Sequence, residues 1–399
     1  MPKLTIPFFL FLFILGALTG LTPFAVDMYI PSIIQISEHI SQSESITQLS
    51  ITIFLFISAI TQLFYGPLSD SFGRRKVILI GICIFIIASL LIVFIQNITQ
   101  LLLLRALQAA GGGAIAVCVN AIVRDYYNDN QLAKAMSYLI MIVIIAPMIA
   151  PIIGGLILLR FDWQMIFYVI AFLAIVFGAG FYFFIQESHP KSKRQPFNIK
   201  GIYSNYSHIL KQPRSIAYIL LGGFSSAPMF IFITNSASVY QVFLGISAQQ
   251  FGFYFGANVL AMMASSWINT RLLNRFDYQN IMHFFIWARL IPASILLIVS
   301  LIVDQHILWY LFPGVVLSIG LMPFVGPNAS AALLSKHGKH AGSASALAGA
   351  ARFGMGAVAG SLASLTQINN NHISMVSWMF VMTILCVLMS VWIRKQKNA

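Results

Sequence analysis

The chain has 399 residues, of which 59% are hydrophobic and only 8% are charged, and this composition excludes a soluble protein. Its formal net charge of +13 would suit a nucleic-acid-binding protein. No basic segment, however, combines the length of a folded domain with interleaved aromatic residues. We therefore expect anionic lipid headgroups, and no nucleic acid, as partners of these cations.

The apolar residues form long continuous stretches and do not alternate with polar ones. A helix of ~20 apolar residues crosses a ~30 Å hydrocarbon layer, whereas a membrane β-strand is shorter and alternates. The sequence therefore predicts an all-α membrane protein with twelve transmembrane helices. The predicted spans are 5–33, 46–65, 77–95, 99–123, 135–159, 163–185, 215–240, 251–270, 281–303, 307–334, 341–366 and 373–393.

The basic residues indicate the orientation, because short cytoplasmic loops retain Lys and Arg. With the N-terminus inside, cations gather on the inner side from Lys3 to Arg394, and the outer loops hold only Arg160. We therefore expect a multi-pass protein of the bacterial inner membrane with both termini in the cytoplasm. The apolar run after Lys3 is too long for a signal peptide, so we expect it to be retained as span one.

The longest inner segment divides the spans six and six. This layout is typical of transporters built from a repeat, whose substrate site lies between the halves. The sequence predicts an N-terminal six-helix bundle at 1–185, a cytoplasmic linker at 186–214 and a C-terminal six-helix bundle at 215–399, related by pseudo-two-fold symmetry. We expect a monomer.

Span one carries Asp27, the only carboxylate that the pattern places inside a span. An intramembrane acid is costly enough that a functional site is the default interpretation. The alternative is an interfacial residue just below Pro31 in a tilted helix.

The inner loop after span two runs from Gly66 to Lys76. Gly66 and Gly73 would supply backbone freedom for a tight turn. Asp70 carries a negative charge, and Arg74 and Arg75 carry positive charges. The alternative is an ordinary positively charged inner loop.

Span four carries Arg105 about 10 Å below the outer surface, at the helical rise per residue. Asp27 belongs to the same outer half of the N-terminal bundle, so the two side chains could pair directly or through water. The alternative is that Arg105 extends to the outer headgroups.

Span five carries two prolines one turn apart, Pro147 and Pro151, each of which removes a backbone donor. Gly154 and Gly155 follow and allow close approach of another helix. This pattern is consistent with a gate helix, and the alternative is a tolerated kink.

The remaining candidates are polar or aromatic residues of spans one, seven and eleven. Phe24, Asn235 and Tyr240 are candidates for lining a central substrate cavity. Arg352 lies near the middle of span eleven, and no acid of the C-terminal spans can pair with it. Either Arg352 faces the cavity, or carbonyls and amides such as that of Asn235 hold it in a structural role.

Several of these motifs resemble, in register, those of the major facilitator superfamily. The stretch 66–75 is similar to its signature loop Gly-x-Leu-x-Asp-x-x-Gly-Arg-Arg, and 105–109 to its Arg-x-x-Gln-Gly motif. The stretch 146–155 looks like the proline-glycine motif of its antiporters. Asp27-Met28-Tyr29-Ile30-Pro31, with the repeated proline spacing, resembles the Bcr/CflA group of drug:proton antiporters.

The resemblance implies the major facilitator fold and a role for each motif. It implies proton coupling by Asp27 and Arg105, and a gate that limits proton leak at Pro147, Pro151, Gly154 and Gly155. It also implies a conformational latch on the inner side, in which Arg74 or Arg75 reaches Asp125. The implied latch residues are Gly66, Asp70, Gly73, Arg74, Arg75 and Asp125.

The predicted function is proton-coupled export of small amphipathic drugs or metabolites by alternating access, with protons and a small molecule as partners. No cofactor is expected, because the proton gradient supplies the energy, and no metal site is indicated. One alternative is a proton-coupled importer of a small metabolite. Another is a membrane enzyme or receptor, but the spans hold no Ser/His, His-Glu-x-x-His or paired-carboxylate constellation.

Overall fold

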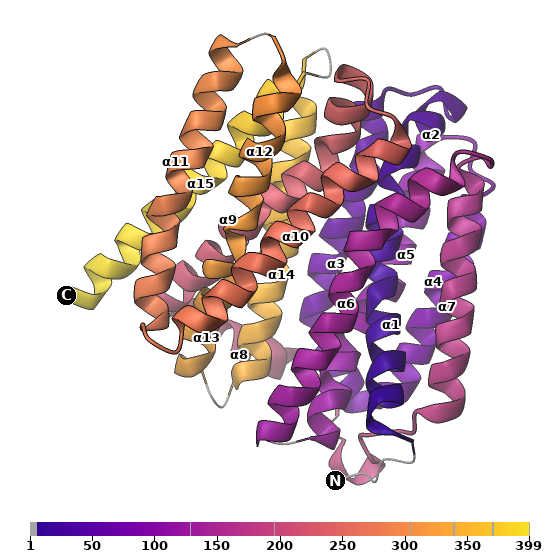
Figure 1. Cartoon of the computed structure of the whole chain (residues 1–399). Helices are drawn as coiled ribbons and strands as arrows, with labels where there is room; N and C mark the ends of the chain where they lie inside the picture. Colours follow the sequence, from indigo (N-terminus) through magenta and orange to yellow (C-terminus); the bar gives the residue numbers. More distant parts are fainter. Residues whose placement is uncertain are drawn as a thin grey trace. The chain divides into compact units, whose positions relative to one another are not determined.

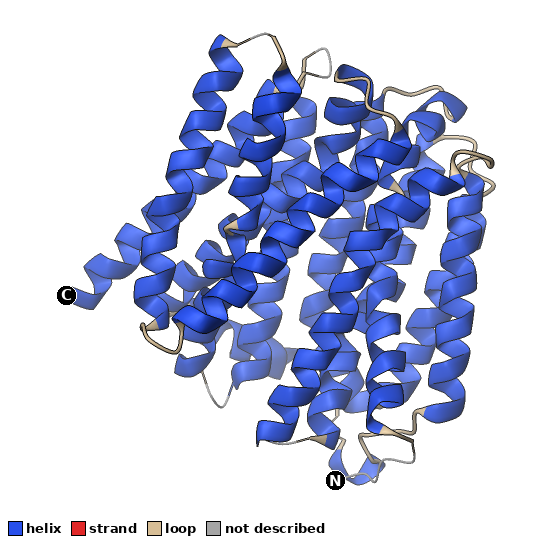
Figure 2. Cartoon of the chain, viewed as in Figure 1, coloured by secondary structure: helices blue, strands red, loops and turns tan. Residues whose placement is uncertain are grey.

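The computed structural model describes residues 6–127, 129–194, 196–303, 305–337, 340–368 and 371–398, and Lys3 lies outside these ranges. The described residues fold into helices and hold no strand (Figure 2). Twelve of the described helical segments are long and apolar enough to cross a membrane. The predicted all-α membrane fold with twelve spans is therefore confirmed.

The chain forms two compact units, Met1–Ile199 and Lys200–Ala399. The boundary between them falls inside the segment predicted as the linker. The helices of the first unit, in chain order (Figure 1), are α1 (Phe8–Asp27), η1 (Ile30–Ser32), α2 (Ile33–His39), α3 (Glu44–Phe72), α4 (Arg74–Ile92), α5 (Ile98–Tyr126), α6 (Asp129–Ile157), α7 (Gln164–Phe184) and η2 (Lys191–Lys193).

The second unit begins with a helix that lies within the segment predicted as the linker. Its helices are α8 (Ile199–Leu210), α9 (Pro213–Ser236), η3 (Ala237–Phe243), α10 (Ala248–Leu272), α11 (Tyr278–Ile302), α12 (Ile307–Gly320), η4 (Met322–Phe324), α13 (Gly326–Lys336), α14 (Ala341–Leu365) and α15 (Ile373–Asn398) (Figure 1).

The loop predicted from Gly66 onward is shorter than the sequence suggested. Gly66 and Pro67 lie inside α3, which continues to Phe72, and only Gly73 separates α3 from α4. The expectation that Gly66 supplies a turn is therefore wrong. A helix can extend beyond the apolar layer without cost to its backbone hydrogen bonds, so polar residues such as Asp70 do not end α3.

Two spans change their helical geometry near one end. The helix α1 ends at Asp27, a 3-10 turn with Pro31 follows, and α2 then continues the span to His39. In the second unit, α9 passes directly into η3, a π-helix. Single π-turns are uncommon and are often found at functional sites.

Glycine allows close packing of α5 against its neighbours. A Cβ added at Gly111 would overlap the backbone of Gly81 and Phe85 on α4, and one at Gly113 would overlap Thr61 on α3. The glycines of α5 therefore allow its backbone to approach α3 and α4 closely within the first unit.

Candidate functional site

Asp27 is the one buried acid among the described side chains, with 3% of its surface exposed. It is the last residue of α1, where the regular helix gives way to the turn that contains Pro31. A carboxylate buried at this depth is costly unless it has a partner or a protonation function. In the described part of the chain Asp27 forms no ion pair.

Arg105 is completely buried on α5 and is held by neutral groups. Its Nη1 donates to the carbonyl oxygen of Ala25 at 2.9 Å and to Oε1 of Gln108 at 2.7 Å. Gln108 in turn donates to Oγ of Ser89 at 2.8 Å. These bonds connect α5 with α1 and α4, and the interval from Arg105 to Gln108 places both side chains on one face of the helix.

Two aromatic rings contact the guanidinium of Arg105. Its carbon lies 4.4 Å from the ring centroid of Tyr29 and 4.7 Å from that of Phe54. The Tyr29 hydroxyl also shares a hydrogen bond of 2.7 Å with Ser50. Cation–π contacts of desolvated arginine contribute about 2 kcal/mol, so the rings offset part of the cost of burying this charge.

The direct ion pair between Arg105 and Asp27 that the sequence allowed is not formed. Arg105 instead binds the carbonyl of Ala25, which precedes Asp27 on the same helix. The Nε and Nη2 atoms of Arg105 have no hydrogen-bond partner among the described residues. One N–H on Nε and two on Nη2 of the guanidinium thus remain without a partner in the described part of the chain.

The proline-containing helix α6 packs against α1 beside Asp27. It is one continuous helix through Pro147 and Pro151. A Cβ added at Gly154 would overlap the carbonyl group of Met28, the residue after Asp27. Glycine at this position therefore lets the backbones of α6 and the end of α1 approach closely.

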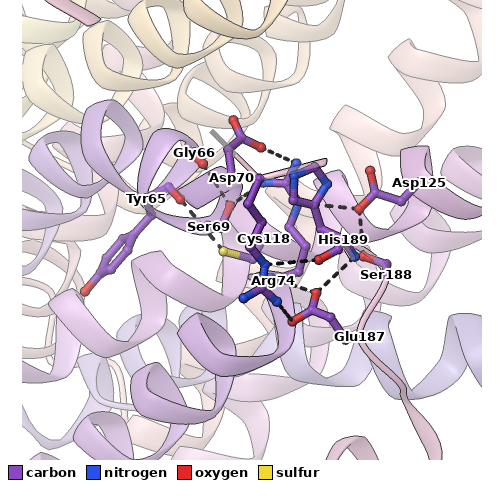
Figure 3. A network of polar contacts seen from close by, with 11 residues as sticks. Tyr65, Gly66, Ser69, Asp70, Arg74, Cys118, Asp125, Glu187, Ser188 and His189 are labelled. Atoms are coloured by element: carbon purple, nitrogen blue, oxygen red, sulfur yellow. Dashed lines mark hydrogen bonds and ion pairs between the residues drawn. The ribbon is translucent and has the colours of Figure 1, made fainter. Parts of the chain in front are cut away.

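The end of the first unit at which α3 meets α4 holds a polar network around Arg74 (Figure 3). Gly73 has φ of 99°, in the left-handed region that favours glycine, and a Cβ there would overlap Glu187 and Arg194. The side chain of Arg74 reaches Asp125 at 3.4 Å and also contacts Asp70 and Ser69. The contact that the sequence predicted from Arg74 or Arg75 to Asp125 is made by Arg74.

The chain after α7 folds back onto this network. Oε1 of Glu187 accepts from the backbone N–H of Arg74 and of His189, both at 3.0 Å. Ser188 donates to the same Asp125 oxygen that Arg74 contacts, at 2.6 Å (Figure 3). Glu187 also pairs with Arg194 at 3.4 Å. The start of the linker is therefore anchored to the start of α4 and the end of α5.

Arg75 takes a different direction from Arg74. Its Nη2 donates to the carbonyl oxygen of Tyr182 at 2.7 Å, and its guanidinium lies 5.2 Å from the ring centroid of the same residue. Arg75 thus packs on the end of α7 and does not bind Asp125.

The candidates of span seven are buried within the second unit. Asn235 donates to the carbonyl oxygens of Ile231, at 2.9 Å, and of Gly360, at 3.3 Å. Asn235 and Tyr240 are fully buried, and the Tyr240 ring contacts Phe232, among other aromatic residues. In the described part of the chain, the Tyr240 hydroxyl and the Asn235 Oδ1 have no hydrogen-bond partner. Phe24 on α1 is partly buried.

Arg352 and Arg289 both lie well inside spans of the second unit, and their environments differ. Arg352 is exposed on α14 and forms no hydrogen bond or ion pair with any residue that the structure describes. The hydrogen bond from Arg352 to Asn235 that the alternative role required is not formed: the Nδ2 of Asn235 donates to two carbonyl groups, and its Oδ1, which could accept from an arginine, has no partner among the described residues. Arg289 is buried and donates to the carbonyl oxygen of Ser225 at 2.9 Å.

Sequence reasoning missed the residues that complete these two sites. Glu187 and Ser188 resembled ordinary loop residues, although an acid directly after an apolar run, on the side that holds Arg74 and Arg75, was a usable signal. Phe54 gave no signal, because aromatic residues are common in spans, and Tyr29 was noted only as a member of the stretch 27–31. No group of three or more His, Cys, Asp and Glu side chains among the described residues has an arrangement suited to a metal ion.

The comparisons with known proteins agree on one family. A model of the Major Facilitator Superfamily matches residues 8–361. The chain is 33% identical over 361 residues to a bicyclomycin resistance protein homolog of Haemophilus influenzae, which covers 90% of each protein. It is 27% identical over 305 residues to multidrug resistance protein D of Escherichia coli, covering 71% of this chain and 76% of that protein. The crystal structure of a nucleoside transporter shares the fold, with a TM-score of 0.75 and 13% identity over 98% of this chain and 99% of that one.

Proposed function

Because the chain belongs to the major facilitator superfamily, we propose that it is a secondary transporter that exports small amphipathic compounds in exchange for protons by alternating access. Membership in this family makes it a multi-pass membrane transport protein and not an enzyme. The proposed location is the inner membrane of a bacterium, with both termini in the cytoplasm, because nearly all loop cations lie on that side.

The proposed proton coupling rests on the environment of Asp27. It is the one buried acid among the described side chains, and no ion pair within the described residues fixes its charge. A carboxyl group in this position can gain and lose a proton as its access to water changes. Arg105, bound to the same end of α1, would favour the ionised form when the two groups approach.

Two further contacts support proposed roles in alternating access. The close packing of Gly154 on Met28 places the gate helix α6 against the turn that follows Asp27, so movement of α6 would alter access to that acid. The network of Arg74, Asp125, Ser188 and Glu187 would act as the latch on the inner side, because its charges are held between α4, α5 and the linker.

The relatives suggest the substrate class. Two of them are named for resistance to bicyclomycin or to several drugs, so we propose drug-like amphipathic compounds, with bicyclomycin as the first probe. Phe24 and Arg352 are proposed to contact the substrate, since neither side chain is fully buried.

The test uses purified protein in proteoliposomes with a pH-sensitive dye and a set proton gradient. Addition of a substrate should release protons from the wild-type protein, and uphill movement of that substrate should stop when the gradient is collapsed. Transport without proton movement would exclude the coupling. Proton-driven uptake in place of efflux would assign the chain as an importer.

A further inference from the structure

A groove on the second unit runs along one face of α11 and ends at α15. Its volume is about 870 Å³. The apolar wall includes Phe284, Trp287, Ile291 and Ile295, which are 67%, 47%, 63% and 57% exposed. Because these positions are three or four residues apart, they form one continuous stripe on the helix.

Most polar groups of the groove, including its one charged side chain, lie toward one end, whereas Ser294 lies near the other. Asn280, near the start of α11, and Arg394, near the end of α15, both line the groove and are exposed. His283 lies between them and is held by a hydrogen bond of 2.6 Å between its Nδ1 and Oγ of Ser390. This bond joins α11 to α15, whose C-terminal end passes α11 and projects beyond it (Figure 1).

The length of the groove matches one leaflet of a bilayer. From Asn280 to Ile295 the helix rises by roughly 22 Å. Half of a bilayer with its headgroup regions is roughly 20–22 Å thick. A phospholipid whose headgroup lies at Asn280 and Arg394 would therefore extend its acyl chain past Trp287 to Ile295.

Charge complementarity favours an anionic headgroup. Arg394 supplies a cation at the polar end, and Lys395 follows it on the same helix. Asp277 caps the N-terminus of α11 by accepting from the N–H of Gln279 at 2.8 Å, so the helix dipole there is already partly compensated. The attraction for an anion must therefore come mainly from Arg394, since basic pockets between helices on the cytoplasmic side bind anionic headgroups.

We propose that this groove is a binding site for one anionic phospholipid of the cytoplasmic leaflet, with its phosphate at Arg394 and its acyl chain against Phe284, Trp287 and Ile291. The site lies outside the residues assigned to proton coupling, gating and the latch. It depends on the membrane location of the chain and not on the direction or the coupling of transport.

The experiment measures tryptophan quenching by lipids with brominated acyl chains. Trp287 is one of six tryptophans, so its signal is the difference between the wild-type protein and Trp287→Phe. Both proteins are placed in bilayers that contain the same small fraction of brominated phosphatidylglycerol or of brominated phosphatidylcholine. We expect a roughly fivefold preference of the Trp287 site for the anionic lipid, the size expected for one arginine near a membrane surface.

Arg394→Gln should abolish this preference, and Lys395→Gln should retain it, because Lys395 does not line the groove. Equal quenching by both lipids in the wild-type protein, or a preference unchanged in Arg394→Gln, would overturn the proposal. Relief of quenching by millimolar inorganic phosphate would assign the site to a free anion. Relief by a transported drug would assign it to the substrate, and either result would contradict a lipid site.

Discussion

Arg105 donates to the carbonyl oxygen of Ala25 at 2.9 Å, so the buried cation is attached to the backbone of the helix that ends at Asp27. The two charged groups are therefore linked through the end of α1 and not by an ion pair. A direct pair would hold Asp27 in its charged form and hinder protonation. A cation kept nearby by a neutral acceptor and two aromatic rings would leave the acid free to change its charge, as the proposed proton coupling requires.

Asp27→Asn should abolish proton-coupled export and leave expression and folding nearly unchanged, because the amide keeps the size of the side chain and removes its titration. The measurement is uphill efflux from proteoliposomes, together with substrate-induced proton release. Glu38→Gln is the matched control, since Glu38 is an exposed acid farther along the same span and should transport normally. Wild-type rates of uphill efflux from Asp27→Asn would remove the proton-coupling assignment.

Gly154→Ala should lower both stability and transport, because the new methyl group would overlap the carbonyl of Met28. Alanine is favoured over glycine in a helix by about 1 kcal/mol, whereas overpacking costs about 1–3 kcal/mol, so the overlap decides the sign. The unfolding temperature in detergent and the rate of efflux measure the effect.

Gly180→Ala is the control for this substitution. Its added Cβ would lie 3.8 Å from Ile14, an ordinary contact, so the helix should be unchanged or slightly more stable. If Gly154→Ala proves as stable and as active as Gly180→Ala, close packing of α6 on α1 is not required.

Glu187→Gln should loosen the start of the linker. The side chain loses its charge, which is bound by two backbone N–H groups and by Arg194. Charge-assisted bonds contribute about 1.5–3 kcal/mol, and partial exposure reduces the expected total to about 1–2 kcal/mol. The form in which the start of the linker is detached from α4 should therefore become roughly tenfold more populated.

Limited trypsin digestion measures this opening, because the linker start contains Lys191 and Arg194. Asp162→Asn, an exposed acid of the first unit, should be cleaved at the wild-type rate. Cleavage of Glu187→Gln no faster than that of this control would mean that Glu187 does not anchor the linker.

The twelve spans were predictable because a helix needs a continuous apolar run to cross the hydrocarbon layer, and because loop cations are retained on one side of the membrane. The ends of these elements were not, since glycine and polar residues, such as Gly66 and Asp70, are compatible with a helix that extends beyond the apolar layer. The break after Asp27 had a signal in Pro31. The π-helix around Tyr240 had none, because its backbone geometry depends on packing against other helices.

The candidate site was predictable in part for a similar reason. Buried charges such as Asp27 and Arg105 stand out in an apolar sequence, and Asp125 was paired correctly with an arginine of the inner loop. The neutral partners were not identifiable, because a carbonyl group such as that of Ala25 exists at every position. Which of them Arg105 contacts follows only from the packing of α1 on α5.

The stability of the second unit should depend on the protonation of His337. Burial, followed by the nearby His208, His340 and Lys336, lowers the pKa of this imidazole, and its Nε2 lies 2.7 Å from the hydroxyl of Ser215. The unfolded chain therefore binds a proton at a higher pH than the folded chain does. The stabilising contribution is present above about pH 6.5, the ordinary value, and is lost as the pH falls through the folded pKa.

His337→Gln should reduce this acid sensitivity. Unfolding temperatures at about pH 7.5 and about pH 5 provide the measurement, with about pH 6.5 as the ordinary titration point of histidine. His189→Gln, in the other unit, controls for the loss of a histidine. An acid-induced decrease of the same size in His337→Gln and in the wild-type protein would show that another group is responsible.

Arg352→Gln should shift the substrate spectrum toward cations. Arg352 is an exposed cation near the middle of α14, and no acid among the described residues pairs with it, so its field is poorly screened in a region of low dielectric constant. Such a charge disfavours monovalent cations and favours neutral, zwitterionic or anionic compounds. The buried Arg289 is bound to Ser225 and should not contribute in this way.

A resistance profile in a host without its own drug pumps tests this selectivity. The wild-type protein should protect better against phenicol-like or acidic compounds than against quaternary ammonium compounds, and Arg352→Gln should narrow or reverse that order at equal membrane level. Arg352→Lys is the matched control, because it keeps the charge and should keep the wild-type order. Best protection of the wild-type host against quaternary ammonium compounds, or an unchanged profile in Arg352→Gln, would mean that this cation does not set selectivity.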